Sequence, residues 1–242
     1  MPAVWYQGKI IQINHLSQTT MEMKLEIELS DGLFDFLPGQ FITMDLPVGE
    51  KRLQRWRSYS IANGPDESNI LELCIVRSPE GLGTKYLFDE TEIGTMIKFK
   101  GPDGGFVLPA DLSDEIIMIC TGTGVAPFRS MINYIKTKNL AFKGIHLIFG
   151  TRNEENILYG EEFETFSKEN PSFRYSVALS RESKPGYHHG YIHDIYLKEY
   201  NQPQAKRQFY ICGWSKMIDE AVANLLINLK YDKSQIHYEL YG

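Results

Sequence analysis

The sequence has few cysteines, and they are not spaced for binding a metal. Its 242 residues include three, Cys74, Cys120 and Cys212, and no two of them form a C-x-x-C pair. An iron–sulfur cluster needs four thiolate ligands, and a disulfide framework or a Cys-rich zinc site also needs more than these. The sequence therefore excludes a cluster held by its own cysteines, and we expect no metal site.

Long apolar runs and an excess of positive charge are missing too. No stretch reaches the roughly 18 consecutive apolar residues of a membrane-spanning helix. The opening residues show neither the charged nor the apolar part of a secretory signal, so with few cysteines we expect a cytoplasmic protein. Lys and Arg number 25 against 31 Asp and Glu, a net charge of −6, which disfavours nucleic acid as a partner.

What the chain does contain is enough hydrophobic sequence, 43%, for one large or two small folded domains. The first part reads as short strands with polar and apolar residues in alternation, separated by turn signals such as Asp31-Gly32 and Pro38-Gly39. The expected strands are Ile10–Ile13, Lys24–Leu29, Phe41–Leu46, Tyr59–Ala62, Ile70–Val76 and Met96–Lys100. Together with one helix over Thr84–Glu90, they predict a small antiparallel barrel or sandwich.

From about residue 113 strands and helices alternate, which is typical of a parallel sheet covered by helices. The expected strands are Glu115–Cys120, Ile145–Phe149, Phe173–Leu179, Phe209–Cys212 and Gln235–Leu240. Helices are expected around Phe128–Ile135, at Asn156–Phe166, at Tyr191–Glu199 and along Met217–Leu229. We place the domain boundary near Pro109–Asp114.

Two glycine-containing turns could hold phosphate groups. The first, Thr121–Pro127, follows a strand and opens a helix, so its backbone N–H groups could bind a diphosphate. The second, Gly81–Thr84, opens the helix of the first part. Taken alone, the first could equally be an ordinary strand–helix turn, and the second a simple helix cap.

Other candidate residues lie at strand ends. Arg57-Ser-Tyr-Ser60 offers a guanidinium for phosphate and an aromatic face for stacking. Cys212-Gly213 and the closing segment His237–Gly242 end strands of the second part, and ligands of parallel sheets bind at that edge. A surface strand and a buried core thiol are the simpler interpretations of the first two.

In order and spacing, these motifs resemble the ferredoxin–NADP reductase family of two-domain flavoproteins along essentially the whole chain. The resemblance is carried by Phe36–Ile42 (FLPGQFI), Arg57–Ser60 (RSYS), Gly81–Thr84 (GLGT), Gly101–Phe106 (GPDGGF), Gly122–Pro127 (GTGVAP), Cys212–Gly213 and Glu239–Tyr241. It implies a six-stranded antiparallel Greek-key barrel that binds FAD, residues 1–110. A five-stranded parallel α/β domain that binds NADP(H) or NAD(H), residues 111–242, would follow.

The resemblance also implies roles in binding FAD. Arg57 and the turn at Gly83 and Thr84 would hold its diphosphate, Tyr59 would pack on the isoalloxazine ring, and Ser60 would lie near N5. The backbone around Cys74–Val76 would face the polar edge of the ring. The full set implied for the flavin is Arg57, Ser58, Tyr59, Ser60, Cys74, Ile75, Val76, Gly81, Leu82, Gly83 and Thr84.

For the nucleotide, the resemblance implies a diphosphate site at the glycine turn and a nicotinamide site beside Cys212 and Gly213. Glu239 would aid proton movement or hold the productive geometry, and Tyr241 would cover the other flavin face until nicotinamide displaces it. The implied catalytic set is Ser60, Cys212, Glu239 and Tyr241. The implied diphosphate set is Thr121, Gly122, Thr123, Gly124 and Pro127.

The choice between NADPH and NADH depends on the ends of two strands. Arg152 follows one of them, and Ser180 and Arg181 end the next, which suits the 2′-phosphate of NADPH. Solvated arginines are the alternative, and Glu182 lies nearby. We expect NADPH to be preferred.

The resemblance implies hydride transfer between nucleotide and flavin, followed by single electrons to a separate acceptor such as ferredoxin or flavodoxin. The basic run of Lys51, Arg52, Arg55 and Arg57 is either a solvated loop with one phosphate-binding Arg or a docking patch for such a partner. The other functions considered are a flavin reductase, the reductase component of an oxygenase system, and a non-catalytic flavin-binding relay or regulatory subunit.

Overall fold

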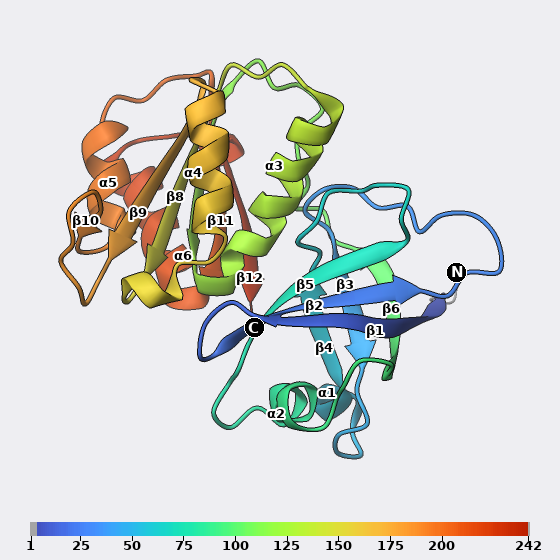
Figure 1. Cartoon of the computed structure of the whole chain (residues 1–242). Coiled ribbons are helices and arrows are strands. Elements are labelled where there is room, and N and C mark those ends of the chain that lie inside the picture. The colour runs from blue at the N-terminus through green and yellow to red at the C-terminus, as the bar shows by residue number, and fades with distance from the viewer. Residues whose placement is uncertain (1–3, 242) are drawn as a thin grey trace. The chain divides into compact units, whose positions relative to one another are not determined.

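The computed structural model describes residues 4–241 and divides them into two compact units. The first contains the described residues up to Leu108 together with Ala126–Asn139. The second contains Pro109–Val125 and the described residues from Leu140 onward. Figure 1 shows an antiparallel strand layer in the first unit and a helix-covered sheet in the second.

The first unit is a six-stranded antiparallel sheet in the order β4-β3-β6-β1-β2-β5. Its strands are β1 (Trp5–His15), β2 (Thr20–Ile27), β3 (Phe41–Asp45), β4 (Trp56–Ser60), β5 (Ile70–Val76) and β6 (Met96–Asp103). An isolated antiparallel bridge from Ile61 to Leu73 brings the β4 end of the order to β5. Alternate side chains, such as Leu25, Ile42 and Phe99, are fully buried in one core. The predicted six-stranded antiparallel architecture of the first part is therefore confirmed.

Three helices belong to this unit: α1 (Arg52–Arg55), α2 (Leu82–Asp89) and α3 (Ala126–Lys138). A buried charged cluster fixes α3 to the strands. Arg129 of α3 lies 2.5 Å from a carboxylate oxygen of Glu72 and 3.9 Å from one of Glu22. Burial raises the pKa of Glu72, but hydrogen bonds from Lys24 and Arg129 outweigh it and leave the pKa lowered. The carboxylate therefore stays charged, and Ser130 adds a 2.6 Å hydrogen bond to the carbonyl of Asn63.

The second unit is a parallel sheet in the order β10-β9-β8-β7-β11-β12. Its strands are β7 (Glu115–Thr121), β8 (Gly144–Thr151), β9 (Phe173–Leu179), β10 (His188–His189), β11 (Arg207–Trp214) and β12 (Ile236–Tyr241). Five of them were predicted. The expected number of five was one too few, because the His188-His189 pair adds a two-residue edge strand beside Ala178 and Leu179. Two residues are too few to show a strand period in the sequence.

The helical elements of this unit are η1 (Gly122–Val125), η2 (Glu154–Asn156), α4 (Gly160–Glu169), α5 (Ile192–Glu199), α6 (Ser215–Ala223), η3 (Asn224–Asn228) and η4 (Lys233–Gln235). A single helix was predicted over Asn156–Phe166, and its predicted first residue was wrong, because α4 begins at Gly160. A short 3₁₀ turn comes first, and Tyr159 takes a left-handed backbone (φ 56°) before α4 begins. In Figure 1, α4 lies in front of the sheet. Ile195 of α5 and Ile218 of α6 pack with Ile119 and Ile211 of the sheet in a single core cluster. Among residues 4–241, no helix is long and apolar enough to cross a membrane.

Candidate functional site

The first candidate site lies where β4 meets the start of α2. Gly83, in the first turn of α2, is buried, and a Cβ placed on it would lie 3.0 Å from Cγ of Arg57 and 3.2 Å from Leu46. Glycine is therefore what allows the Arg57 side chain to lie against the beginning of this helix. A guanidinium beside exposed helix N–H groups is a combination that binds phosphate.

The remaining guanidinium contacts of Arg57 hold it in place. Its Nη1 donates to the carbonyl oxygens of Leu53 (2.8 Å) and Trp56 (2.7 Å). On the same turn, the hydroxyl of Thr84 accepts from the N–H of Ser78 at 3.1 Å and lies 3.1 Å from the carbonyl oxygen of Gly81. Gly81 is the N-cap residue of α2, and Leu82 is exposed beside it. The predicted phosphate residues are thus gathered by α2 and β4, and they fit a diphosphate.

Tyr59 and Ser60 end strand β4, opposite Ile42 and Phe41 of β3. Burial raises the pKa of Tyr59 to about 12, although the charge of Arg57 opposes the shift. The phenol is neutral at physiological pH, and the partly buried ring packs against the core of the first unit. Ser60 is buried, and Ser58 pairs its hydroxyl with that of Thr43 at 3.0 Å.

Cys74, Ile75 and Val76 close strand β5, which pairs antiparallel with β2. Cys74 and Ile75 are buried, whereas Val76 is partly exposed. Their predicted contact with the flavin is through the backbone; β5 ends the strand order of the sheet, and α2 follows it in the chain within the same unit.

The second candidate site lies at the carboxyl edge of the parallel sheet. Gly124 of η1 is buried, and a Cβ on it would lie 2.4 Å from the carbonyl oxygen of Cys212 and 2.8 Å from Cα of Gly213. The glycine turn therefore packs directly on the backbone at the end of β11. Beside it, Thr121 has a buried hydroxyl with no hydrogen-bond partner among the described residues. Buried polar groups are normally hydrogen-bonded, so the unpaired Thr121 hydroxyl at this turn fits a site that binds a nucleotide.

Strand register adds the rest of the predicted catalytic residues of this unit. Cys120, Cys212 and Glu239 lie opposite one another on β7, β11 and β12. Burial and the neighbouring Cys212 raise the pKa of Cys120 well above its usual value, so that thiol is neutral. Cys212 is fully buried, while Glu239 is partly exposed. Tyr241 lies opposite Trp214 in the register, but its side chain is outside the described part of the structure, as is Gly242.

The other members of the predicted nucleotide set lie at turns and helix starts. Gly122 and Thr123 are half-buried in η1, and Pro127 is buried in the first turn of α3. Because α3 groups with the first unit, the glycine turn and Pro127 fall in different units.

Arg152, Ser180 and Arg181 come together after β8 and β9. The N–H of Arg181 donates to the carbonyl of Arg152 (3.0 Å), and the Ser180 N–H to that of Thr151 (3.0 Å). Both arginines are exposed, and within residues 4–241 neither makes a salt bridge. Arg181 lines a hollow of about 480 Å³ together with Asn153, Glu154, Glu155, Glu182 and Lys184.

Sequence reasoning did not find the acidic and basic lining of this hollow. Lys184 forms ion pairs with Glu154 and Glu182, and Glu182 accepts from the N–H of Glu154 at 2.8 Å. The position of these residues just past two strand ends was the available signal.

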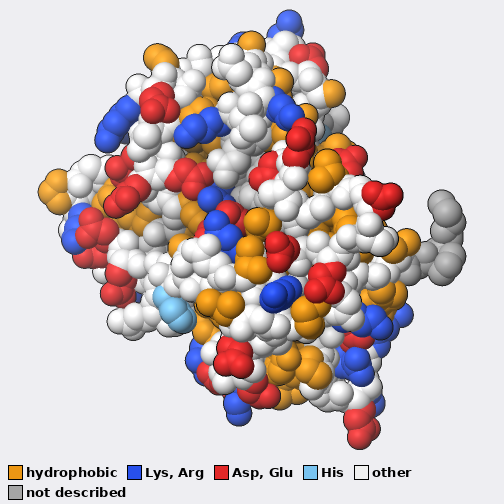
Figure 2. Space-filling view, turned by 45° about the vertical axis from the view of Figure 1, so that its right-hand side comes forward, with side chains coloured by type: hydrophobic (Ala, Val, Ile, Leu, Met, Phe, Trp, Pro, Cys, Tyr) orange, Lys and Arg blue, Asp and Glu red, His pale blue; other side chains and the backbone are white. Residues whose placement is uncertain are grey.

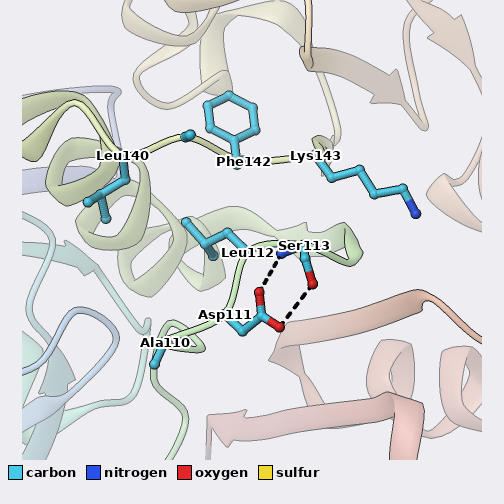
Figure 3. Close-up of a pocket in the computed structure, with 8 residues that line it drawn as sticks. Ala110, Asp111, Leu112, Ser113, Leu140, Phe142 and Lys143 are labelled. Atoms are coloured by element: carbon cyan, nitrogen blue, oxygen red, sulfur yellow. Dashed lines mark hydrogen bonds between the residues drawn. The ribbon is translucent and has the colours of Figure 1, made fainter.

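A second hollow lies away from these residues. About 470 Å³ in volume, it is lined by Ala110–Ser113 and Leu140–Lys143 (Figure 3). Asp111 accepts two hydrogen bonds from Ser113 there. These segments precede β7 and β8, so the hollow is at the amino edge of the sheet, opposite the edge where nucleotides bind. On the face in Figure 2, Lys and Arg side chains are mixed with Asp and Glu, without a broad area of one sign.

Two protein-family models match most of the chain. The oxidoreductase FAD-binding domain matches residues 7–108, and the oxidoreductase NAD-binding domain matches residues 118–223. No described group of three or more His, Cys, Asp or Glu side chains could hold a metal ion.

The similar proteins include named reductases, in agreement with the two oxidoreductase family models. The chain is 29% identical to ferredoxin–NADP reductase B of Sorangium cellulosum, over 98% of this chain and 97% of that one. It is also 29% identical to the phenol hydroxylase P5 protein of Acinetobacter pittii, matching 97% of this chain but spanning 65% of that protein's length. The structure of the Amycolatopsis cytochrome P450 reductase GcoB superposes with a TM-score of 0.87 at 25% identity, covering 99% of this chain and 70% of that one. The FAD-binding and NAD-binding models, the motif order and these relatives together show that the chain belongs to the ferredoxin–NADP reductase-like family of flavoprotein oxidoreductases.

Proposed function

We propose that this protein takes hydride from NAD(P)H onto FAD and passes single electrons to a separate protein acceptor. Residues 1–110 hold FAD in this proposal, and residues 111–242 hold the nucleotide. The observation that carries it is the close packing of Gly124 on the Cys212–Gly213 backbone. It joins a diphosphate-binding turn to the residue beside which the nicotinamide would lie.

When bound, FAD would supply the hydride chemistry, between the nicotinamide C4 and its own N5, and would allow release of single electrons. The chain's own residues bind and orient. Arg57 and the start of α2 neutralise the FAD diphosphate, and the neutral ring of Tyr59 packs on the isoalloxazine. The hydroxyl of Ser60 holds the N5 edge in place. The buried Cys212 would lie beside the nicotinamide, and the Glu239 carboxylate, next to it in register, would aid proton movement or hold the productive geometry.

A visible spectrum and an anaerobic titration test this proposal. The purified protein should be yellow, with about one FAD per chain after gel filtration, and NADPH should bleach the flavin band. Ferricyanide should then restore the band. A protein that retains FAD but is bleached by neither nucleotide would be a non-catalytic relay, and a colourless protein that reduces added FMN would be a flavin reductase.

We further propose that NADPH is preferred to NADH. The support is the pair of exposed arginines, Arg152 and Arg181, beside Ser180 at the two strand ends. Replacing both by Ala should raise KM for NADPH about tenfold or more and leave KM for NADH unchanged, because one charge-assisted phosphate contact contributes roughly 1.5–3 kcal/mol. The exposed Lys168→Ala is the control, and an equal rise of KM for both nucleotides would contradict a 2′-phosphate contact.

The acceptor is a separate electron carrier in this proposal, either a ferredoxin or flavodoxin or a component of an oxygenase system. Ferredoxin–NADP reductase B supports the first, and the phenol hydroxylase P5 protein supports the second. The three cysteines, none in a disulfide, support a reducing compartment such as the cytoplasm. Comparing kcat/KM for a [2Fe–2S] ferredoxin, a flavodoxin and an oxygenase component distinguishes these acceptors.

A further inference from the structure

Two tryptophans and three cationic side chains form a compact group on the first unit, which we call the Trp5–Trp56 patch. The rings of Trp5 and Trp56 meet edge to face, with centroids 5.4 Å apart. The guanidinium of Arg52 and the ammonium of Lys100 lie over Trp56, at 4.4 Å and 5.0 Å, and Lys98 lies over Trp5 at 4.8 Å. The group thus combines aromatic faces with positive charge.

Strand register shows that the patch is on the outer face of the sheet. Trp5 pairs with Lys100, and Lys100 pairs with Thr43. The neighbouring pair of Phe99 with Met44 is fully buried. Because successive side chains of a strand point to opposite faces, the patch lies on the side away from the core. Next to it in the sequence, Leu53 is 86% exposed.

The basic run of α1 and β4 is divided by its contacts. Arg55 donates to the carboxylate of Asp45 at 2.8 Å, and Arg57 lies against Gly83 and two backbone carbonyls. Of these arginines only Arg52 faces the tryptophans. The positive charge of the patch is instead completed by β6, whose Lys98 and Lys100 come from a distant part of the sequence. Among the three cations of the patch, Arg52, Lys98 and Lys100, only Lys100 lies within salt-bridge distance of an acidic side chain in the described residues. Its ammonium is 3.5 Å from the Asp103 carboxylate.

We propose that the Trp5–Trp56 patch docks a small acidic electron-carrier protein, an inference that rests on the proposed function. Its positive charge on a chain of net charge −6 matches a negative partner surface. Trp5 and Trp56 are partly exposed and Arg52 is exposed, and tryptophan and arginine are among the residues that dominate protein–protein interfaces. Trp56 precedes Tyr59 by three residues on β4, roughly 10 Å along the strand at about 3.3 Å per residue, so the patch and the predicted flavin residues share one short strand and lie on its two faces.

Steady-state reduction of an acidic [2Fe–2S] ferredoxin by the FAD-loaded protein tests the patch. Arg52→Glu together with Lys98→Glu should lower kcat/KM for ferredoxin about tenfold at low salt, and the difference from wild type should disappear near 0.5 M salt. Lys136→Glu with Lys138→Glu, two exposed lysines at the end of α3, changes the net charge equally and should have little effect. With ferricyanide as acceptor, all three proteins should have the same kcat, which also checks folding and FAD loading.

The outcomes separate the two proposals. If no protein reduces ferricyanide with NADPH or NADH, the proposed function fails. If ferricyanide reduction is normal but both double variants reduce ferredoxin equally well, or are equally slowed, the docking patch is refuted. It is likewise refuted if the patch variant loses binding to duplex DNA or to anionic phosphatidylserine vesicles while ferredoxin reduction is unchanged.

Discussion

Gly124→Ala should separate nucleotide binding from flavin binding. The added methyl would lie 2.4 Å from the carbonyl oxygen of Cys212, 2.7 Å from its carbonyl carbon and 2.8 Å from Cα of Gly213. All three contacts are with backbone, so no flexible side chain can move aside. An ordinary contact needs about 3.4 Å, so the turn η1 must shift by about 1 Å.

A shift of that size at a binding turn should lower kcat/KM for NADPH about 100-fold, since misplacement by about 1 Å costs roughly that factor. The residues proposed to bind flavin, Arg57, Tyr59 and Gly83, are in the other unit, so FAD content should remain near one per chain. NADPH–ferricyanide kinetics and the visible spectrum of the same preparation measure both quantities.

Gly105→Ala is the matched control, because a Cβ there meets nothing within 4 Å and the backbone needs no positive φ. It should leave kcat/KM and FAD content unchanged. If Gly124→Ala keeps kcat/KM within threefold of wild type at full FAD content, the glycine turn does not bind the nucleotide. If it loses FAD as well, the independence of the two sites is wrong.

Three further changes test other parts of the structure. Arg57→Ala should weaken FAD binding 10- to 100-fold, since hydrogen bonds to a charged group contribute roughly 1.5–3 kcal/mol; equilibrium dialysis measures this, with the exposed Arg77→Ala as control. Arg129→Ala should destabilise the first unit by about 3 kcal/mol in urea unfolding because Glu72 and Glu22 stay buried; a loss below about 1 kcal/mol would show that the cluster does not fix α3. Burial lowers the pKa of His146 from 6.5 to about 3 in the folded protein. As pH falls below 6.5, His146 is protonated in the unfolded chain but not in the folded one, so the stability present above pH 6.5 is lost. From pH 7 to pH 5 this should cost about 2 kcal/mol, and His146→Gln should unfold in urea without that part of the pH dependence.

The fold was predictable because each unit has a regular hydrophobic period. Alternation in Lys24–Ile27 and Ile70–Leu73 and the nearly continuous apolar run Ile116–Cys120 predicted strands, and the burial of these residues follows the same two patterns. Short or irregular elements were not predictable. Strand β10 has two residues, and the start of α4 depends on the left-handed backbone of Tyr159, which no local pattern announces.

The same limit applies to α3. Its apolar residues Phe128, Met131, Ile132 and Ile135 predicted a helix but not the surface to which it is fixed. The position of α3 depends on Arg129, whose partners lie on two different strands. Glu72 is 57 residues away in the sequence, and Glu22 is still farther. A buried ion pair across such a distance needs one exact folded geometry, and composition carries no trace of it.

Strand alternation also explains why one basic run serves more than one purpose. As a sequence, Arg52, Arg55 and Arg57 look like a single positive surface. In β4, Arg57 and Tyr59 point to one side and Trp56 and Ser58 to the other, where the Ser58 hydroxyl meets that of Thr43 and Trp56 meets Trp5 and Lys100. A change at Arg57 should therefore affect flavin binding, and a change at Arg52 should affect only the acceptor. Arg52 of α1 lies over Trp56 on one face of β4, and Arg57 points to the other face, so the two effects should combine additively in a double variant.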